Sequence, residues 1–162
     1  MMPIYLRVTY LSLIIIAILG MSSSAAIGQE THLAKTARLL NESGINYAKV
    51  NDTTWTVTFD GKSLKEIPVA VTTGDGIFIA FTLIKDAKGI KLPAPALLKL
   101  LQLNEDLDRV KVGIGKDGQI SVRIDVSLRT LDKDDLAVLV NQVAAAADEV
   151  HIAIKGHLPK AK

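Results

Sequence analysis

Apolar and polar residues alternate along two segments of this chain, and this alternation constrains its fold more than any other feature. Trp55, Val57 and Phe59 alternate with threonines, and residues 120–128 alternate apolar side chains with Ser, Arg and Asp. A period of two is typical of a β-strand, because successive side chains point to opposite faces of a sheet. The pattern predicts two strands, with Trp55 in the core and one face of the second strand in water.

Further extended segments are separated by short turns that contain glycine. Extended structure is expected to begin at Ile45–Val50, and strands are predicted at residues 67–71, 77–84 and 110–114. The segment 77–84 is apolar at nearly every position, so both of its faces are expected to be covered. Short turns favour antiparallel pairing of these strands.

Three helices are predicted between and around the strands, two of them amphipathic and the one at residues 96–103 apolar nearly all round. They cover residues 32–42, residues 96–103, and a segment that Asp132 caps and whose buried stripe runs from Leu136 to Ala147. The resulting order is α-β-β-β-α-β-β-α. We therefore expect an α+β fold in which helices cover an antiparallel sheet of about five strands.

The amino-terminal segment is typical of a secretory signal peptide. Arg7 precedes the mostly apolar stretch Val8–Leu19, and small residues follow it. Cleavage would leave either Ile27 or Gln29 first, and we prefer Gln29 because a polar sequence follows. An uncleaved anchor is the alternative, but polar residues interrupt the apolar run before it reaches the length of a membrane span.

These features predict a signal peptide at residues 1–28, one domain at residues 29–154 and a flexible polar tail at residues 155–162. The mature protein is expected in the periplasm or outside the cell, in a bacterial envelope, without stable insertion in a membrane.

Composition excludes several classes of function. The chain has no cysteine, which excludes disulfides, thiolate nucleophiles and cysteine metal ligands. Its 19 basic and 17 acidic side chains nearly balance, so no strong field would steer it to nucleic acid.

Motifs that could carry chemistry have simpler structural interpretations. Residues 113–118 match the glycine pattern of dinucleotide-binding loops, but strands flank them on both sides, which predicts a hairpin turn. His32, His151 and His157 lack the spacing of metal ligands. The acidic run from Asp132 to Asp135 lacks the glycine and the glutamate of a calcium loop, so it is interpreted as a helix cap. We expect no catalytic residue, cofactor or metal.

The segment Leu97–Val126 resembles the helix and hairpin of the YbjN family and of the related type III secretion chaperones. In that pattern a Leu-rich helix ends in an Asn, and a short strand, a glycine turn and a longer amphipathic strand follow. The resemblance covers most of residues 31–150 and implies a homodimer that binds other polypeptides, or a regulator, with no cofactor. Secretion chaperones of that kind work in the cytoplasm, and the predicted signal peptide departs from the pattern.

We therefore predict an exported, non-enzymatic protein-binding domain, chaperone-like or regulatory, that forms a homodimer. The candidate partner-binding residues are Leu97, Leu100, Leu101, Arg123 and Asp125, together with the threonine face at Thr54, Thr56 and Thr58. The alternative is a module that binds a small ligand or an envelope polymer in a cleft beside the loop Lys85–Pro95.

Overall fold

The computed structural model describes residues 30–84 and 90–158, and Thr31–Lys162 forms one compact unit. The predicted signal peptide lies outside the described residues, as do residues 85–89 of the loop beside which the alternative ligand cleft was expected. Both therefore stay predictions.

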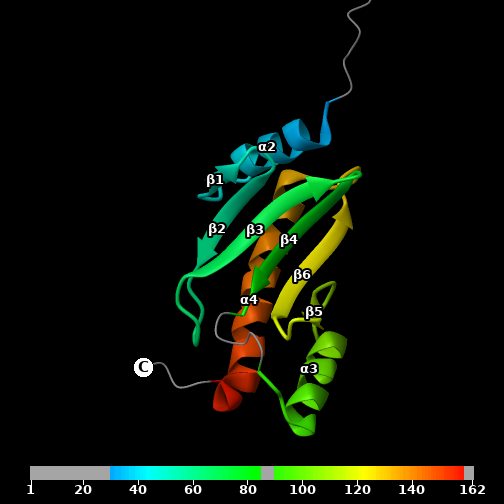
Figure 1. The fold of residues 1–162 in the computed structure, drawn as a ribbon. Coiled ribbons are helices and arrows are strands. Elements are labelled where there is room, and N and C mark those ends of the chain that lie inside the picture. Colours follow the sequence, from blue (N-terminus) through cyan, green and yellow to red (C-terminus); the bar gives the residue numbers. More distant parts are fainter. Residues whose placement is uncertain (1–29, 85–89, 159–162) are drawn as a thin grey trace, which may run out of the picture. The chain divides into compact units, whose positions relative to one another are not determined.

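The unit is built on a single antiparallel sheet of six strands, which confirms the predicted α+β class (Figure 1). The spatial order is β1-β2-β3-β4-β6-β5. The strands are β1 (Ala48–Asn51), β2 (Thr54–Phe59), β3 (Ile67–Gly74), β4 (Ile77–Leu83), β5 (Lys111–Ile114) and β6 (Ile120–Ser127).

The strand that was not counted among the expected five is β1. All four of its residues are exposed, so it has no buried face to produce an alternating pattern. It forms because the turn at Asn51–Thr53 folds it back onto β2, where Lys49 lies opposite Trp55. Asn51 Oδ1 accepts the Thr53 N–H at 2.9 Å and stabilises that turn.

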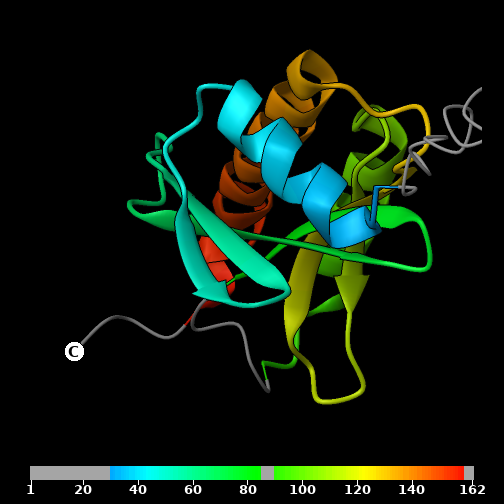
Figure 2. The same cartoon turned by 90° about the horizontal axis from the view of Figure 1, so that it is seen from above.

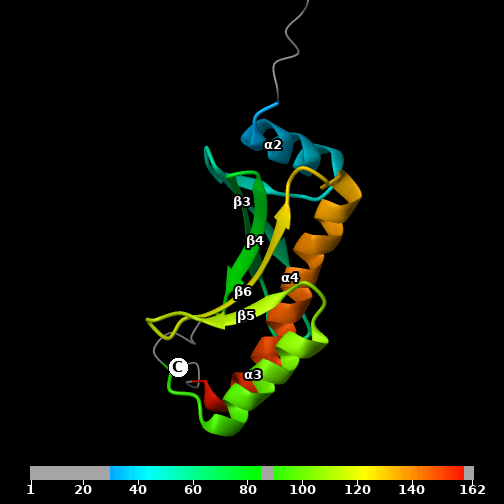
Figure 3. The same ribbon diagram turned by 90° about the vertical axis from the view of Figure 1, so that its right-hand side faces the viewer.

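Three α-helices accompany the sheet: α2 (His32–Glu42), α3 (Ala94–Asp106) and α4 (Lys133–Ile154). The longest, α4, lies along one face of the sheet, with α2 near one end of that layer and α3 near the other (Figures 1 and 3). Seen from above, α2 crosses over the layer that α4 forms (Figure 2). In the part of the chain that the structure describes, no helix covers the opposite face of the sheet.

The core lies between this layer and the sheet. Phe78, Val122 and Ile124 contribute fully buried side chains from the sheet, and Leu136 and Val143 do so from α4. Trp55 is 5% exposed, which confirms its predicted place in the core. Burial of this kind contributes about 25 cal/mol per Å² of apolar surface removed from water.

The helix α4 is apolar because it is a core element. By length and composition the stretch Lys133–His157 could cross a membrane, but half of its most apolar window is buried inside the unit. A helix that packs on a sheet needs an apolar side of this kind, so its hydropathy is explained by the fold.

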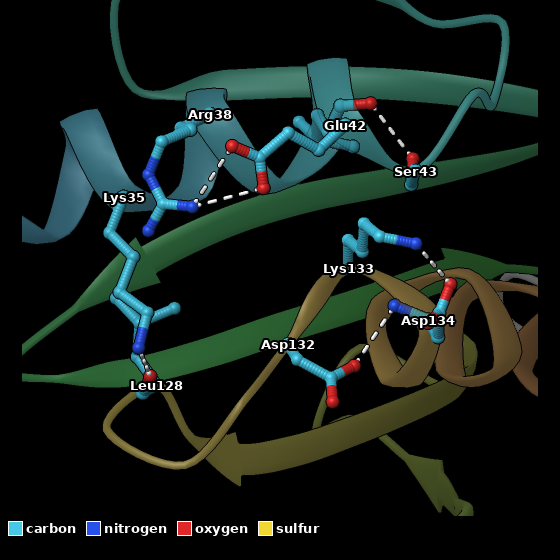
Figure 4. Close-up of polar contacts among 9 residues, drawn as sticks. Lys35, Arg38, Glu42, Ser43, Leu128, Asp132, Lys133 and Asp134 are labelled. Atoms are coloured by element: carbon cyan, nitrogen blue, oxygen red, sulfur yellow. Dashed lines mark hydrogen bonds and ion pairs between the residues drawn. The ribbon is translucent and has the colours of Figure 1, made fainter.

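Side-chain caps and one long-range contact fix the ends of the helices. Thr31 Oγ1 accepts the Ala34 N–H at 3.1 Å, and Asp132 Oδ1 accepts from the N–H groups of Asp134 and Asp135, which confirms the predicted cap. Lys35 Nζ donates to the carbonyl oxygen of Leu128 at 2.6 Å and thereby ties α2 to the segment that follows β6 (Figure 4).

The glycine motif at residues 113–118 forms the hairpin between β5 and β6, as predicted. The Gly115 N–H donates to the Gln119 carbonyl at 2.8 Å, and Gly118 has a φ of +77°. A strand follows this turn where a dinucleotide site needs a helix N-terminus, so the turn has no phosphate-binding geometry.

At the carboxyl end, regular structure extends a few residues past α4. Residues Lys155–His157, predicted to belong to a flexible tail, form a 3-10 turn, and Leu158 packs against the core. That apolar contact holds the turn in place. The remaining tail residues, 159–162, lie outside the described residues.

Candidate partner-binding surface

A row of apolar side chains runs along β4 on the uncovered face of the sheet. Ile77 and Leu83 are 42% and 49% exposed, and Ile79 and Phe81 between them are half-buried. We call these four residues the apolar row. We predicted that both faces of this strand would be covered, and that prediction is wrong. Among residues 30–84 and 90–158, the helices cover the face of Phe78, Ala80 and Thr82, and the apolar row is shielded by its strand neighbours.

A band of small and hydroxyl-bearing side chains lies on one side of the apolar row. Thr54, Thr56 and Thr58 of β2 lie on the face opposite to the buried Trp55 and Val57, so they share a face as predicted. In the register of β2 and β3, Thr54 pairs with Thr72, Thr56 with Ala70 and Thr58 with Pro68. This band offers hydrogen-bonding groups without charge.

Charged side chains lie on the other side of the row, on β6 and β5. The register places Arg123 opposite Phe81 and Asp125 opposite Ile79. Arg123 Nη2 donates to Asp125 Oδ1 at 2.6 Å, and Lys111 Nζ lies 3.4 Å from Asp125 Oδ2. The predicted residues Arg123 and Asp125 are thus brought together beside the apolar row, in a group that carries one more positive charge than negative.

The electrostatics of this group keep Asp125 ionised. Partial burial by itself raises the pKa of its carboxyl, but the hydrogen bond and charge of Arg123, followed by those of Lys111, outweigh this effect and lower the pKa. Half of the Arg123 side chain remains exposed and is accessible to a partner.

A second exposed apolar surface lies on α3. Leu97, Leu98 and Leu101 are 38%, 57% and 66% exposed, whereas Leu100 is only 4% exposed. The structure therefore places two of the predicted residues, Leu97 and Leu101, at the surface and the third, Leu100, in the core. Leu100 differs because it lies, with Ala96, on the side of the helix that faces the rest of the unit.

The predicted residues do not form one site. Arg123 and Asp125 lie on β6, Leu97 and Leu101 lie on α3, and β5 pairs with β6 on one side while contacting α3. The structure thus presents two surfaces: the open sheet face, which consists of the apolar row with its flanking bands, and the exposed leucines of α3.

Asp148 on α4 is a buried polar residue that sequence reasoning missed. It is 6% exposed, and its carboxylate accepts three main-chain N–H groups from the loop between β2 and β3. The distances are 2.9 Å from Lys62 to Oδ2, and 2.8 Å from Ser63 and 2.7 Å from Leu64 to Oδ1. Burial raises the pKa of this carboxyl, but these bonds and the nearby His151 outweigh it and lower the pKa.

This arrangement fixes the loop between β2 and β3 against α4. Ser63 Oγ and His151 Nδ1 lie 3.0 Å apart and add a second contact between the loop and α4. A cavity of about 430 Å³ opens beside the carboxylate, with Asp60, Asn141 and Glu149 in its wall. Among residues 30–84 and 90–158, no group of three or more acidic or histidine side chains could hold a metal ion.

Comparison with known proteins rests on structure alone, because no family model matches the chain and no curated protein matches its sequence. SycH, a type III secretion chaperone of Yersinia pestis solved with a fragment of YscM2, has a TM-score of 0.54 and 16% identity. The match covers 74% of this chain and 99% of that one. YbjN of E. coli, a candidate transcription regulator, has a TM-score of 0.53 and 14% identity, over 77% of this chain and 92% of that one.

The fold is that of YbjN and of the type III secretion chaperones. A chain of the ExoU–SpcU complex from Pseudomonas aeruginosa matches with a TM-score of 0.51 and 19% identity, over 76% of this chain and 98% of that one. These matches confirm the fold that the segment Leu97–Val126 suggested. Two of the three solved structures are complexes with a polypeptide partner.

Proposed function

We propose that this protein is an exported, non-enzymatic polypeptide-binding protein, chaperone-like or regulatory, and that it binds its partner on the open sheet face. The observation that carries the proposal is the apolar row on an inner strand of the sheet, which has a side chain more than 40% exposed at each end and two half-buried side chains between them. Clustered exposed apolar side chains bordered by polar residues are typical of protein interaction sites.

The flanking groups indicate what kind of partner fits. Threonine hydroxyls on one side and the group of Lys111, Arg123 and Asp125 on the other can bind the polar groups of a segment whose apolar side chains cover the row. The extra positive charge favours an acidic residue in that segment. An amphipathic polypeptide segment has this combination, and the polypeptide partners in the ExoU–SpcU and SycH–YscM2 structures support the same class of partner.

Photo-crosslinking in the native host tests this surface. The full chain would carry a photoreactive residue at Ile77 or Leu83, with Val138 as the control because it is 54% exposed on α4. We expect polypeptide adducts from the two sheet positions and none from the control. Leu83→Asp should reduce the adducts formed from Ile77 about tenfold or more, because burying a leucine contributes roughly 1.5–3 kcal/mol.

Equal adducts from Val138, or yields from Ile77 that Leu83→Asp leaves unchanged, would rule out this face as the binding surface.

Fractionation of the same cells tests the export part of the proposal. We expect the crosslinked chain in the envelope fraction, shortened by the length of the predicted signal peptide. Recovery of the unshortened chain with the cytoplasmic proteins would contradict export.

We also propose that the protein forms a homodimer and that the exposed leucines of α3 lie in the interface. Leu98→Asp or Leu101→Asp is expected to convert the purified protein from dimer to monomer, because each would place a carboxylate where a leucine is buried between subunits. Size-exclusion chromatography with light scattering measures the mass. Lys99→Asp is the control, since Lys99 is an exposed residue of the same helix that lies on the side away from Leu101. A wild-type monomer, or a dimer unaffected by both leucine variants, would refute this interface.

A further inference from the structure

The outer edge of β5 is an end of the sheet. Among the described residues, β5 pairs with β6 and has no strand on its other side. In an antiparallel pair, successive residues direct their main-chain groups alternately toward and away from the neighbouring strand. Val112 and Ile114 therefore direct their N–H and C=O groups outward, where a further strand could pair with them.

At Val112 this outward position is already occupied by a side chain. Asn104, in the last turn of α3, accepts the Val112 N–H through Oδ1 at 2.6 Å and donates through Nδ2 to the Val112 carbonyl at 3.0 Å. A neighbouring strand in an antiparallel pair would likewise bind both the N–H and the C=O group of Val112. The Asn104 amide thus reproduces both hydrogen bonds of a strand neighbour.

Apart from this contact with α3, the edge has features that permit pairing with a copy of itself. The side chain of Ile114 is 49% exposed, and β5 carries one charged residue, Lys111. In an antiparallel pairing of two β5 strands about Val112, Lys111 of one copy would lie opposite Gly113 of the other. No like charges would face each other, so nothing in the register itself prevents the association.

We propose that Asn104 is an edge guard: it occupies the pairing position of Val112 and prevents β5 from pairing with β5 of a second copy. The contact between Asn104 and Val112 is intramolecular, and it competes with the formation of a continuous sheet between two molecules. It is independent of the proposed function, because neither the open sheet face nor the leucine interface of α3 requires it.

The absence of cysteine from the chain makes a direct test possible. A single cysteine introduced as Val112→Cys would lie opposite itself in the paired state. In the Asn104→Ala background we expect this variant to form a covalent dimer under mild oxidation, at least tenfold faster than with Asn104 present. Gln102→Ala is the matched control, because it removes an exposed amide from the same helix and should leave crosslinking unchanged.

Hydrogen exchange gives a second measurement that does not depend on crosslinking. In dilute protein, in which the β5 edges of two copies do not pair, the Val112 amide should exchange about tenfold faster in Asn104→Ala than in the wild type, with core amides unchanged. Asn104→Asp keeps the acceptor and removes the donor, so its crosslinking should lie between the two. Equal crosslinking with and without Asn104, or an unchanged Val112 amide in Asn104→Ala, would overturn the proposal. Hydrogen exchange is measured on protein that is not crosslinked. It therefore reports the loss of the Asn104 contact whether or not the proposed α3 homodimer forms.

Discussion

Replacing Asp148 by Ala is expected to lower the free energy of unfolding by about 3–5 kcal/mol. The substitution leaves three main-chain N–H groups of the loop without an acceptor in a position where Asp148 is 6% exposed. Hydrogen bonds to a charged group are worth about 1.5–3 kcal/mol each, and an unsatisfied buried donor costs a similar amount. Urea unfolding of the purified protein at neutral pH measures the loss.

Asp148→Asn separates charge from shape and predicts a pH dependence. The folded state lowers the pKa of Asp148, so the ionised form stabilises the fold. This contribution is fully present above the unfolded value of about 3.9 and is lost as pH falls through the folded pKa. The stability difference between wild type and Asp148→Asn should therefore shrink below about pH 4.

The neighbouring Glu149 provides the control for this pair of variants. It is exposed, and Glu149→Gln should change stability by no more than about 0.5 kcal/mol. If Asp148→Ala were as mild as Glu149→Gln, the loop would be held by other contacts and the assigned role of Asp148 would be wrong.

Gly61→Ala is expected to destabilise the protein by about 2–3 kcal/mol, near the upper end of the cost of overpacking. A Cβ at Gly61 would lie 2.5 Å from Asp148 Oδ1 and 2.6 Å from its Cγ. The carboxylate cannot move away without losing its bonds to Lys62, Ser63 and Leu64. Thermal or urea unfolding measures the effect. Gly156→Ala, where a Cβ would meet nothing within 4 Å, should be nearly neutral.

A double-mutant cycle tests whether Asp148 is the cause. With Asp148→Ala in place, the added methyl at Gly61 has room, so Gly61→Ala should cost at least 1 kcal/mol less than in the wild type. Additive effects of the two substitutions would show that the strain lies elsewhere in the loop.

The importance of Asp148 was readable in part from the sequence. Along a helix, position 148 falls on the same side as Ala144 and near Ala147, both on the predicted buried stripe. An acid on such a stripe indicates a buried, partnered carboxylate. Its partners were not predictable, because they are main-chain groups more than 80 positions earlier in the chain.

The sequence also could not predict which face of the sheet the helices cover, or which exposed segments pair as strands. The alternation around Trp55 and along β6 fixed which faces are buried, because burial and period agree there. Along β4 every position is apolar except Thr82, so the pattern could not reveal which face lacks a helix. The edge strand β1 has only exposed residues and depends on its pairing with β2.

On α3 the composition obscured the orientation. Five leucines between Leu97 and Leu103 made the helix look apolar nearly all round, and only its docking decides that Leu100 is buried and Leu101 exposed. Asn104 drew attention only as the residue that ends the helix. Its role depends on Val112, eight residues later, being brought back against the helix.

Because the layer of helices lies on one side only, the residues that stabilise the fold differ from those of the face that we propose binds a partner. Side chains such as Leu83 or Thr58 can be exchanged at little cost in folding free energy, since few core contacts depend on them. Selection for a new partner can therefore alter the open surface rapidly while the residues beneath it stay fixed. If the open face binds the partner as proposed, proteins with this scaffold should diverge fastest on that side of the sheet.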